Sequence, residues 1–204
     1  MLNIIIHALG RLFISVFIGV SSAPKLTDKQ CIIAANHNSH VDIMVLFRLF
    51  PLTKINKVKT IAAKDYFSKG LLGFMARSVF NSILVDRRAS ARETMDMFTK
   101  EIEAGYSLII FPEGTRGKPG VIKEFKSGIG KLALDFPDLP IYPVYLSGAE
   151  KTLPRGAQVP VPFNITINVL PPVYGREYAG DNPKESRDKI TAEIEARIRS
   201  LTAD

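Results

Sequence analysis

Apolar runs that alternate with amphipathic segments constrain the fold of this 204-residue chain more than any other feature. The runs are continuous, so strands built from them need an apolar neighbour on both faces. We expect strands at 30–35, 59–63, 82–85, 107–111, 140–148 and 163–170, and helices at 41–50, 65–80, 90–105, 125–136 and 183–201. This order predicts an α/β protein with a mixed, largely parallel central sheet flanked by helices on both faces.

The first 20 residues are mostly apolar, and their polar members return at every fourth position. On a helix this spacing gives one narrow polar stripe, made of Asn3, His7, Arg11 and Ser15. A cation in the middle of the segment would be costly inside a bilayer, whereas a helix lying in the headgroup layer can turn the stripe toward water. We therefore predict an N-terminal apolar, membrane-associating helix within 1–24 and one folded domain over 25–204.

Two other interpretations of this segment stay open. The Ser-Ser-Ala-Pro sequence that follows would suit a signal peptide, although a charged n-region is missing and Arg11 interrupts the apolar stretch. The segment could also pack on the domain as an ordinary core helix.

The charge balance narrows the range of partners. Lys and Arg outnumber Asp and Glu by 27 to 20, a formal net charge of +7, which favours an anionic partner such as a phosphate group or an acidic lipid. The sequence has no block of Lys and Arg with interleaved aromatic residues and no zinc-finger or RNA-binding signature, so we expect no nucleic-acid partner. Cys31 is the only cysteine, which excludes an intramolecular disulfide and fits a reducing compartment.

The stretch Asn-His-Asn-Ser-His-Val-Asp at 36–42 places histidines, amides and an acid between two apolar runs. Ser39 and Asp42 have the spacing of a capping box, with Ser39 as N-cap, Asp42 at the third helical position and His37 in the approach loop. In that geometry Asp42 reaches back toward His37, and a histidine beside a carboxylate is the minimal general-base pair. The alternative is that the helix is merely capped and both histidines are incidental.

A second polar stretch, Pro-Glu-Gly-Thr-Arg-Gly at 112–117, directly follows the apolar run that ends at Phe111. Glycine lets the backbone approach a ligand, and the planar guanidinium of Arg116 suits a phosphate group. A plain turn with a solvated arginine is the alternative. Arg87 and Arg88 follow the run at 82–85, at the same expected end of the sheet, but two exposed arginines alone do not define a site.

Taken together, these residues resemble the glycerolipid acyltransferase family, which includes the 1-acyl-glycerol-3-phosphate acyltransferases. The family's pattern N-H-x-S-x-x-D is matched at 36–42 and its pattern F-P-E-G-T-R at 111–116. A strand that ends in an arginine is matched at 82–87 and a proline-bearing strand at 140–144, so that four motifs occur in the family's order. Two positions depart from the pattern: Asn81 stands where many members have glycine, and Gly117 where serine is frequent.

The resemblance implies roles for individual residues. His37 is the general base and Asp42 its orienting partner. The phosphate-bearing acceptor is held by Arg87, Glu113, Gly114, Thr115, Arg116 and Lys126. Neither a metal ion nor a cofactor is implied, because the acyl group arrives on a co-substrate, acyl-CoA or acyl carrier protein (acyl-ACP).

The implied activity is transfer of a fatty acyl group from that thioester to the hydroxyl of a lysophospholipid, with 1-acyl-glycerol-3-phosphate as the first candidate and phosphatidate as product. Glycerol 3-phosphate, another lysophospholipid or an ornithine-type lipid are other acceptors. The implied partners are thus the acceptor, the donor and a lipid surface, at the cytoplasmic face of a membrane. A thioesterase is an alternative function, although the G-x-S-x-G motif of many serine hydrolases is absent from this sequence. A lipid-binding protein without catalytic activity is a second alternative.

Overall fold

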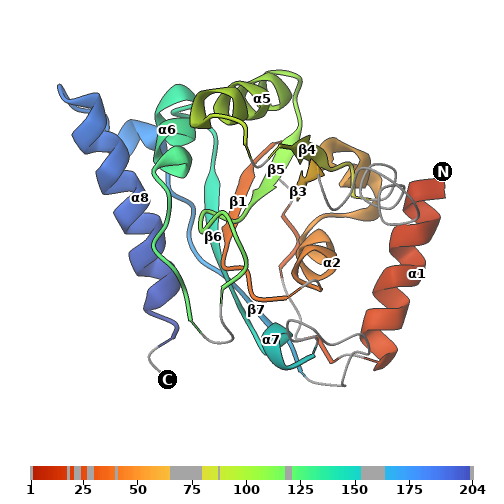
Figure 1. Cartoon of the computed structure of the whole chain (residues 1–204). Helices are drawn as coiled ribbons and strands as arrows, with labels where there is room; N and C mark the ends of the chain where they lie inside the picture. Colours follow the sequence, from red (N-terminus) through yellow and green to blue (C-terminus); the bar gives the residue numbers. More distant parts are fainter. Residues whose placement is uncertain are drawn as a thin grey trace.

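A five-stranded sheet of order β2-β5-β1-β6-β7 forms the centre of the molecule and separates two layers of helices (Figure 1). The computed structural model describes residues 2–17, 19–20, 24–26, 30–39, 41–64, 80–86, 88–117, 121–152 and 164–202. Four strands are parallel, namely β1 (Ile32–Ala35), β2 (Val58–Lys59), β5 (Ser107–Ile110) and β6 (Ile141–Ser147), and β7 (Thr166–Val169) pairs antiparallel with β6. The predicted α/β class with a mixed, mostly parallel sheet is confirmed.

A second, two-stranded parallel sheet consists of β3 (Ile61–Ala63) and β4 (Ile83–Val85). The single strand expected at 59–63 is therefore two strands in two sheets. Thr60 lies at the change of sheet: its carbonyl accepts from the N–H of Ile83 at 2.8 Å, and its hydroxyl lies 2.8 Å from that of Ser82. These contacts turn the chain away from β5 and toward β4.

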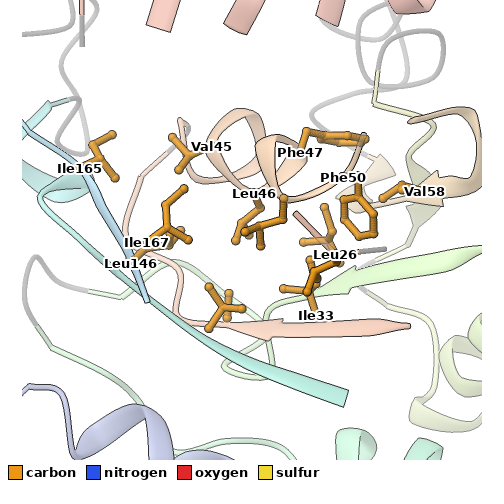
Figure 2. Packing of buried hydrophobic residues seen from close by; sticks show 14 of the residues in the cluster. Leu26, Ile33, Val45, Leu46, Phe47, Phe50, Val58, Leu146, Ile165 and Ile167 are labelled. Atoms are coloured by element: carbon orange, nitrogen blue, oxygen red, sulfur yellow. The ribbon is translucent and has the colours of Figure 1, made fainter. Parts of the chain in front are cut away.

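One face of the main sheet is covered by the short helices that follow β1. These are α2 (Asp42–Leu46), η1 (Phe47–Leu49) and η2 (Leu52–Lys57), joined at the far end by α7 (Ala149–Thr152). Figure 2 shows Val45, Leu46 and Phe47 above Ile33 and Leu146 of the sheet, and all five side chains are buried. The helix expected at 41–50 is shorter than predicted, because α2 continues as the tighter η1 before Pro51.

The opposite face carries α5 (Ala91–Glu103), α6 (Gly128–Asp135), the short η4 (Gly175–Glu177) and α8 (Pro183–Arg199) (Figure 1). The helix expected at 183–201 is present as α8, and Ile190, Ile194 and Ile198 form an apolar stripe along it that is fully buried. Asn182 caps this helix through its side-chain oxygen, and Pro183 occupies the first turn, where no N–H partner is needed. The two layers of helices thus bury every residue of the central strands β1 and β5.

Helix α1 (Leu2–Phe17) lies outside α2, at the edge of the molecule (Figure 1). The prediction that its polar stripe faces water is wrong at His7 and Arg11, which face the domain, whereas Ser15 is exposed. Arg11 donates to the main-chain oxygens of Phe47 and Phe50, at 2.8 and 2.5 Å, and His7 is buried with its ring 4.6 Å from that of Phe47. Phe50 is the C-cap of η1, so its carbonyl lies where a helix leaves oxygens without an intrahelical donor, and Arg11 supplies one. The Phe47 carbonyl accepts from Arg11 in addition to the N–H of Phe50.

The apolar face of α1 is left toward the outside. Ile5, Leu9 and Leu12 are 55 to 61% exposed, although each is a large aliphatic side chain. The described part of the chain contains no helix whose length and apolarity would let it cross a bilayer. The helix expected at 65–80 lies, up to residue 79, outside the described residues.

Candidate active site

The two polar motifs meet because they follow neighbouring parallel strands. Strands β1 and β5 pair in register, with Ala34 opposite Ile110, so that the chain leaves both strands at the same edge of the sheet. His37 emerges from β1 and Glu113 from β5. Ligands of α/β sheets bind at this carboxyl edge.

His37 and Asp42 form the contact that the sequence predicted. The Nδ1 atom of His37 lies 2.8 Å from Oδ2 of Asp42, whose side chain is fully buried, whereas 17% of the His37 side chain is exposed. The same Oδ2 atom accepts from the main-chain N–H groups of Asn38 and Ser39, at 2.9 and 2.8 Å. An acceptor with three donors holds the ring, and the tautomer with a proton on Nδ1 leaves Nε2 as the basic nitrogen.

The predicted capping box is only half present. Asp42 does reach back to the N–H of Ser39, but it is the first residue of α2 and not the third. The Ser39 hydroxyl accepts instead from the N–H of Val41, at 3.4 Å. The Asp42 carboxylate thus binds N–H groups of the loop that precedes α2, and not those of the first turn of the helix.

Asn36 ties the histidine loop to the next strand of the sheet. Its side chain is buried and exchanges two hydrogen bonds with the main chain of Leu146, at 2.9 and 2.8 Å. The first residue of the motif therefore serves the framework, since it joins the end of β1 to the end of β6.

Phe111 completes the immediate surroundings of His37. The two rings are stacked, with centroids 3.9 Å apart and an angle of 16° between their planes. The main chain of His37 is also held from the second motif: its N–H donates to Oε1 of Glu113 at 2.8 Å, and its carbonyl accepts from the N–H of Gly117 at 2.9 Å. Ring and backbone are thus both bound to the segment that follows β5.

Cationic side chains gather on that segment. Gly114 has a φ of +73° and is exposed, and a Cβ atom built on it would lie 2.6 Å from Nζ of Lys126. Lys123 donates from Nζ to the hydroxyl of Thr115 at 3.0 Å and to the carbonyl of Arg116 at 3.2 Å. Lys123 and Lys126 thus lie against the turn that carries Arg116, and cations gathered in this way suit a phosphate group.

The expected acceptor residues do not all share one environment. Gly114, Thr115 and Lys126 are exposed and Arg116 is half-buried, as a binding loop requires. Glu113 is 4% exposed, and both of its oxygens accept from main-chain N–H groups, those of His37 and Lys123. Arg87 and His40 lie outside the described residues.

Two residues near the site were missed from the sequence. Phe111 is the first residue of the F-P-E-G-T-R motif, but the motif does not indicate that its ring stacks on His37. Lys123 had no signal, because a lysine in a loop is unremarkable until its partners are known. Within the described residues no three His, Cys, Asp or Glu side chains are grouped so that they could hold a metal ion.

The two departures from the family pattern have local explanations. Asn81 has a φ of +46°, a left-handed conformation that glycine adopts freely and that asparagine tolerates better than most residues. A Cβ atom on Gly117 would lie 2.7 Å from the carbonyl oxygen of Val121, so this loop closes too tightly for a side chain.

The model of the family described as Acyltransferase matches residues 17–147, which include both motifs and the sheet edge that joins them. The chain belongs to the acyltransferase family. The resemblance seen in the sequence is thereby confirmed, and the His37–Asp42 pair and the turn at 112–117 are the parts of this acyltransferase chain that carry the family's motifs.

Curated relatives of this acyltransferase chain bear more specific names. It is 31% identical over 185 residues to the 1-acyl-sn-glycerol-3-phosphate acyltransferase of Limnanthes douglasii, covering 88% of this chain and 63% of the relative. It is 29% identical over 170 residues to the probable 1-acyl-sn-glycerol-3-phosphate acyltransferase of Mycoplasma pneumoniae, covering 76% of this chain and 62% of the relative. The chain therefore spans less than two thirds of the length of these relatives.

A solved structure has the same fold as this acyltransferase. The crystal structure of the 1-acyl-sn-glycerophosphate (LPA) acyltransferase from Thermotoga maritima superposes with a TM-score of 0.73 and covers 99% of this chain and 80% of its own. Only 21% of the residues are identical, so this likeness concerns the fold.

Proposed function

We propose that the protein transfers a fatty acyl group from an acyl-CoA or acyl-ACP thioester to the hydroxyl of 1-acyl-glycerol-3-phosphate, which gives phosphatidate. The observation that carries the proposal is the His37–Asp42 pair, 2.8 Å apart, on the same sheet edge as the turn with Arg116 and Lys126. The names of the relatives point to the same acceptor.

The reaction needs only a base and a way to hold the acceptor. Asp42 keeps the Nδ1 proton of His37, so Nε2 takes the proton from the acceptor hydroxyl while that oxygen attacks the thioester carbonyl. The carbon–sulfur bond breaks, and the thiolate of CoA or of the carrier protein leaves and recovers the proton. The charge on Asp42 stabilises the imidazolium that exists between these two events.

The acceptor phosphate would bind over the turn at 114–116. Gly114 and Thr115 leave the backbone open to a ligand, and Arg116 and Lys126 supply cations of the kind that bind phosphate. Arg87 remains a further candidate from the sequence. This arrangement would hold the glycerol hydroxyl near His37.

A lipid substrate also suggests a function for the exposed apolar face of α1, which is contact with a membrane. We propose that Ile5, Leu9 and Leu12 enter the headgroup and upper acyl region at the cytoplasmic face of a membrane, while Arg11 keeps the helix docked on the domain. Replacing the three side chains with glutamine should abolish flotation with liposomes that contain phosphatidylglycerol. Met97→Gln, at an exposed methionine of α5, is the matched control and should float normally; equal flotation of all variants would remove α1 from membrane attachment.

Activity is tested with acyl-CoA and acyl-ACP donors against a panel of acceptors, read as thiol release and as lipid product by mass spectrometry. Lysophosphatidate should be the preferred acceptor, and His37→Ala should lower kcat about 10²- to 10⁴-fold. His40→Ala, at a position that the motif leaves open, is the control. Thiol release that is independent of any acceptor would favour the thioesterase alternative, and lipid binding without thiol release would favour a non-catalytic protein.

A further inference from the structure

Glu113 is set apart from its neighbours on the binding turn by its burial. It is 4% exposed, whereas the next two residues, Gly114 and Thr115, are exposed. Its two carboxylate oxygens each face one main-chain N–H group, that of His37 at 2.8 Å and that of Lys123 at 3.0 Å. The side chain therefore points beneath the turn and joins two loops.

The link through Glu113 is one of several that hold His37 to the second motif. Gly117 donates to the His37 carbonyl at 2.9 Å, and the Phe111 ring is stacked on the imidazole. Both polar groups of the His37 main chain are thus bonded to the segment 113–117. Asp42 holds Nδ1 of the ring from the other side, so the direction of Nε2 is determined jointly by the two motifs.

The hydrogen bonds at Glu113 require a carboxylate, and its charge and burial are unfavourable for contact with the acceptor. Two N–H donors converge on it from different loops, and only a side chain with two acceptor atoms can satisfy both. A phosphate group beside it would be repelled by its negative charge. With each oxygen already bonded to an N–H group and only 4% of the residue exposed, Glu113 presents almost no surface to a ligand.

We propose that Glu113 is a positioning residue: it sets the place of His37 relative to the acceptor-binding turn and does not bind the acceptor. The proposal rests on the proposed acyl transfer to lysophosphatidate. It separates the acid of the turn from the cations beside it, since Arg116 and Lys126 act on the phosphate while Glu113 acts on the histidine main chain.

Steady-state kinetics of Glu113→Gln with lysophosphatidate test the proposal. Glutamine keeps one acceptor atom and turns an NH2 group toward the other N–H, which shifts His37 by a fraction of an ångström or more. Because a misplacement of about 1 Å can cost about 10² in rate, we expect kcat to fall about 10- to 100-fold while the acceptor KM stays within about twofold. Lys126→Gln should show the opposite split, a raised acceptor KM with kcat little changed.

Glu124→Gln is the matched control, because Glu124 lies on the same segment and is exposed. Its kinetics should equal those of the wild type. If Glu113→Gln raises the acceptor KM and leaves kcat unchanged, Glu113 binds the acceptor and the proposal is wrong. Glu113→Asp, which keeps the charge but not the reach, should retain more kcat than Glu113→Gln.

Residue-resolved hydrogen exchange on the unmutated protein provides a measurement that does not depend on a variant or on turnover. The amide protons of His37 and Lys123 should both be protected, and exchange at the rate of an exposed loop at either position would overturn the proposal. If the wild type does not acylate lysophosphatidate, the proposed function fails, and the exchange result still decides whether Glu113 holds the two loops together.

Discussion

Replacing Asp42 with asparagine isolates the charge of the pair from its hydrogen bonds. In the structure all three bonds to Asp42 end on Oδ2, and Oδ1 is buried with no hydrogen-bond partner among the described residues. An asparagine can place its carbonyl oxygen at the position of Oδ2 and its NH2 group at the position of Oδ1. The loop should therefore keep its shape while the carboxylate charge is lost.

The magnitude follows from the distance and the burial of the two groups. When Nε2 takes the acceptor proton, the ring becomes a cation about 4 Å from the carboxylate charge, and at an effective dielectric constant of about 20 their attraction is about 4 kcal/mol. The value of about 20 suits a site where Asp42 is fully buried and 17% of the His37 side chain is exposed. Desolvation offsets part of this attraction, so we expect a loss of about 3 to 4 kcal/mol, which lowers kcat about 10²- to 10³-fold.

The assay is thiol release from acyl-CoA in the presence of lysophosphatidate, with thermal unfolding measured on the same preparations. Asp42→Asn should melt within about 5 °C of the wild type. Placed in a His37→Ala background, Asp42→Asn should cause no further loss, because its charge then has no imidazolium to stabilise. A folded Asp42→Asn protein with kcat within about threefold of the wild type would refute the reasoning.

Three further substitutions test the fold and the turn. Gly130→Ala should lower the free energy of unfolding in urea by about 3 kcal/mol, because its Cβ atom would lie 2.1 Å from a main-chain oxygen of α8. Asn36→Ala should lower it by about 2 to 4 kcal/mol, because a buried donor and a buried acceptor of Leu146 lose their partners. Gly114→Ala should raise the acceptor KM, because alanine at a φ of +73° costs about 1 to 2 kcal/mol and its Cβ would displace Lys126.

Each of these substitutions has its own control or contrary result. Gly180→Ala is the control for Gly130→Ala: it places a Cβ atom in ordinary contact, 3.5 Å from a serine hydroxyl, and should unfold like the wild type. If Gly130→Ala had the urea midpoint of the wild type, α6 and α8 would not be in tight contact. Asn36→Ala with unchanged stability would show that the link between β1 and β6 is dispensable. A Gly114→Ala protein with normal acceptor KM would place the phosphate away from the turn.

The strands and helices with strong local signals were predictable from the sequence. The apolar run at 107–111 became β5, and the Asn-Pro start of α8 became a capped helix, because both signals act over a few residues. The prediction of one strand at 59–63 was wrong at Thr60, where the chain leaves the five-stranded sheet and enters the two-stranded sheet. Pairing partners are decided by residues distant in sequence, so a local pattern could not reveal that change.

The contact between His37 and Asp42 was predictable for the same reason, since five residues separate the two and a helix start brings them together. The surroundings of Glu113 were not predictable. Its letter in the motif suggested a ligand for the acceptor, but its burial and its two N–H partners depend on where β5 ends relative to β1. Its carboxylate meets His37, 76 residues away, only because the two strands are neighbours.

By itself the sequence determined the α/β class, the family and the two motifs, because apolar periodicity and short-range spacing are written along the chain. The tertiary structure alone decided which side of α1 faces the domain. A helix with one polar stripe can turn that stripe to water or to main-chain carbonyls of the domain, and the outcome depends on the oxygens of Phe47 and Phe50, which Arg11 reaches only in the folded protein. Contacts with residues far away in the sequence, among them the two hydrogen bonds of Arg11, go with this orientation of the helix.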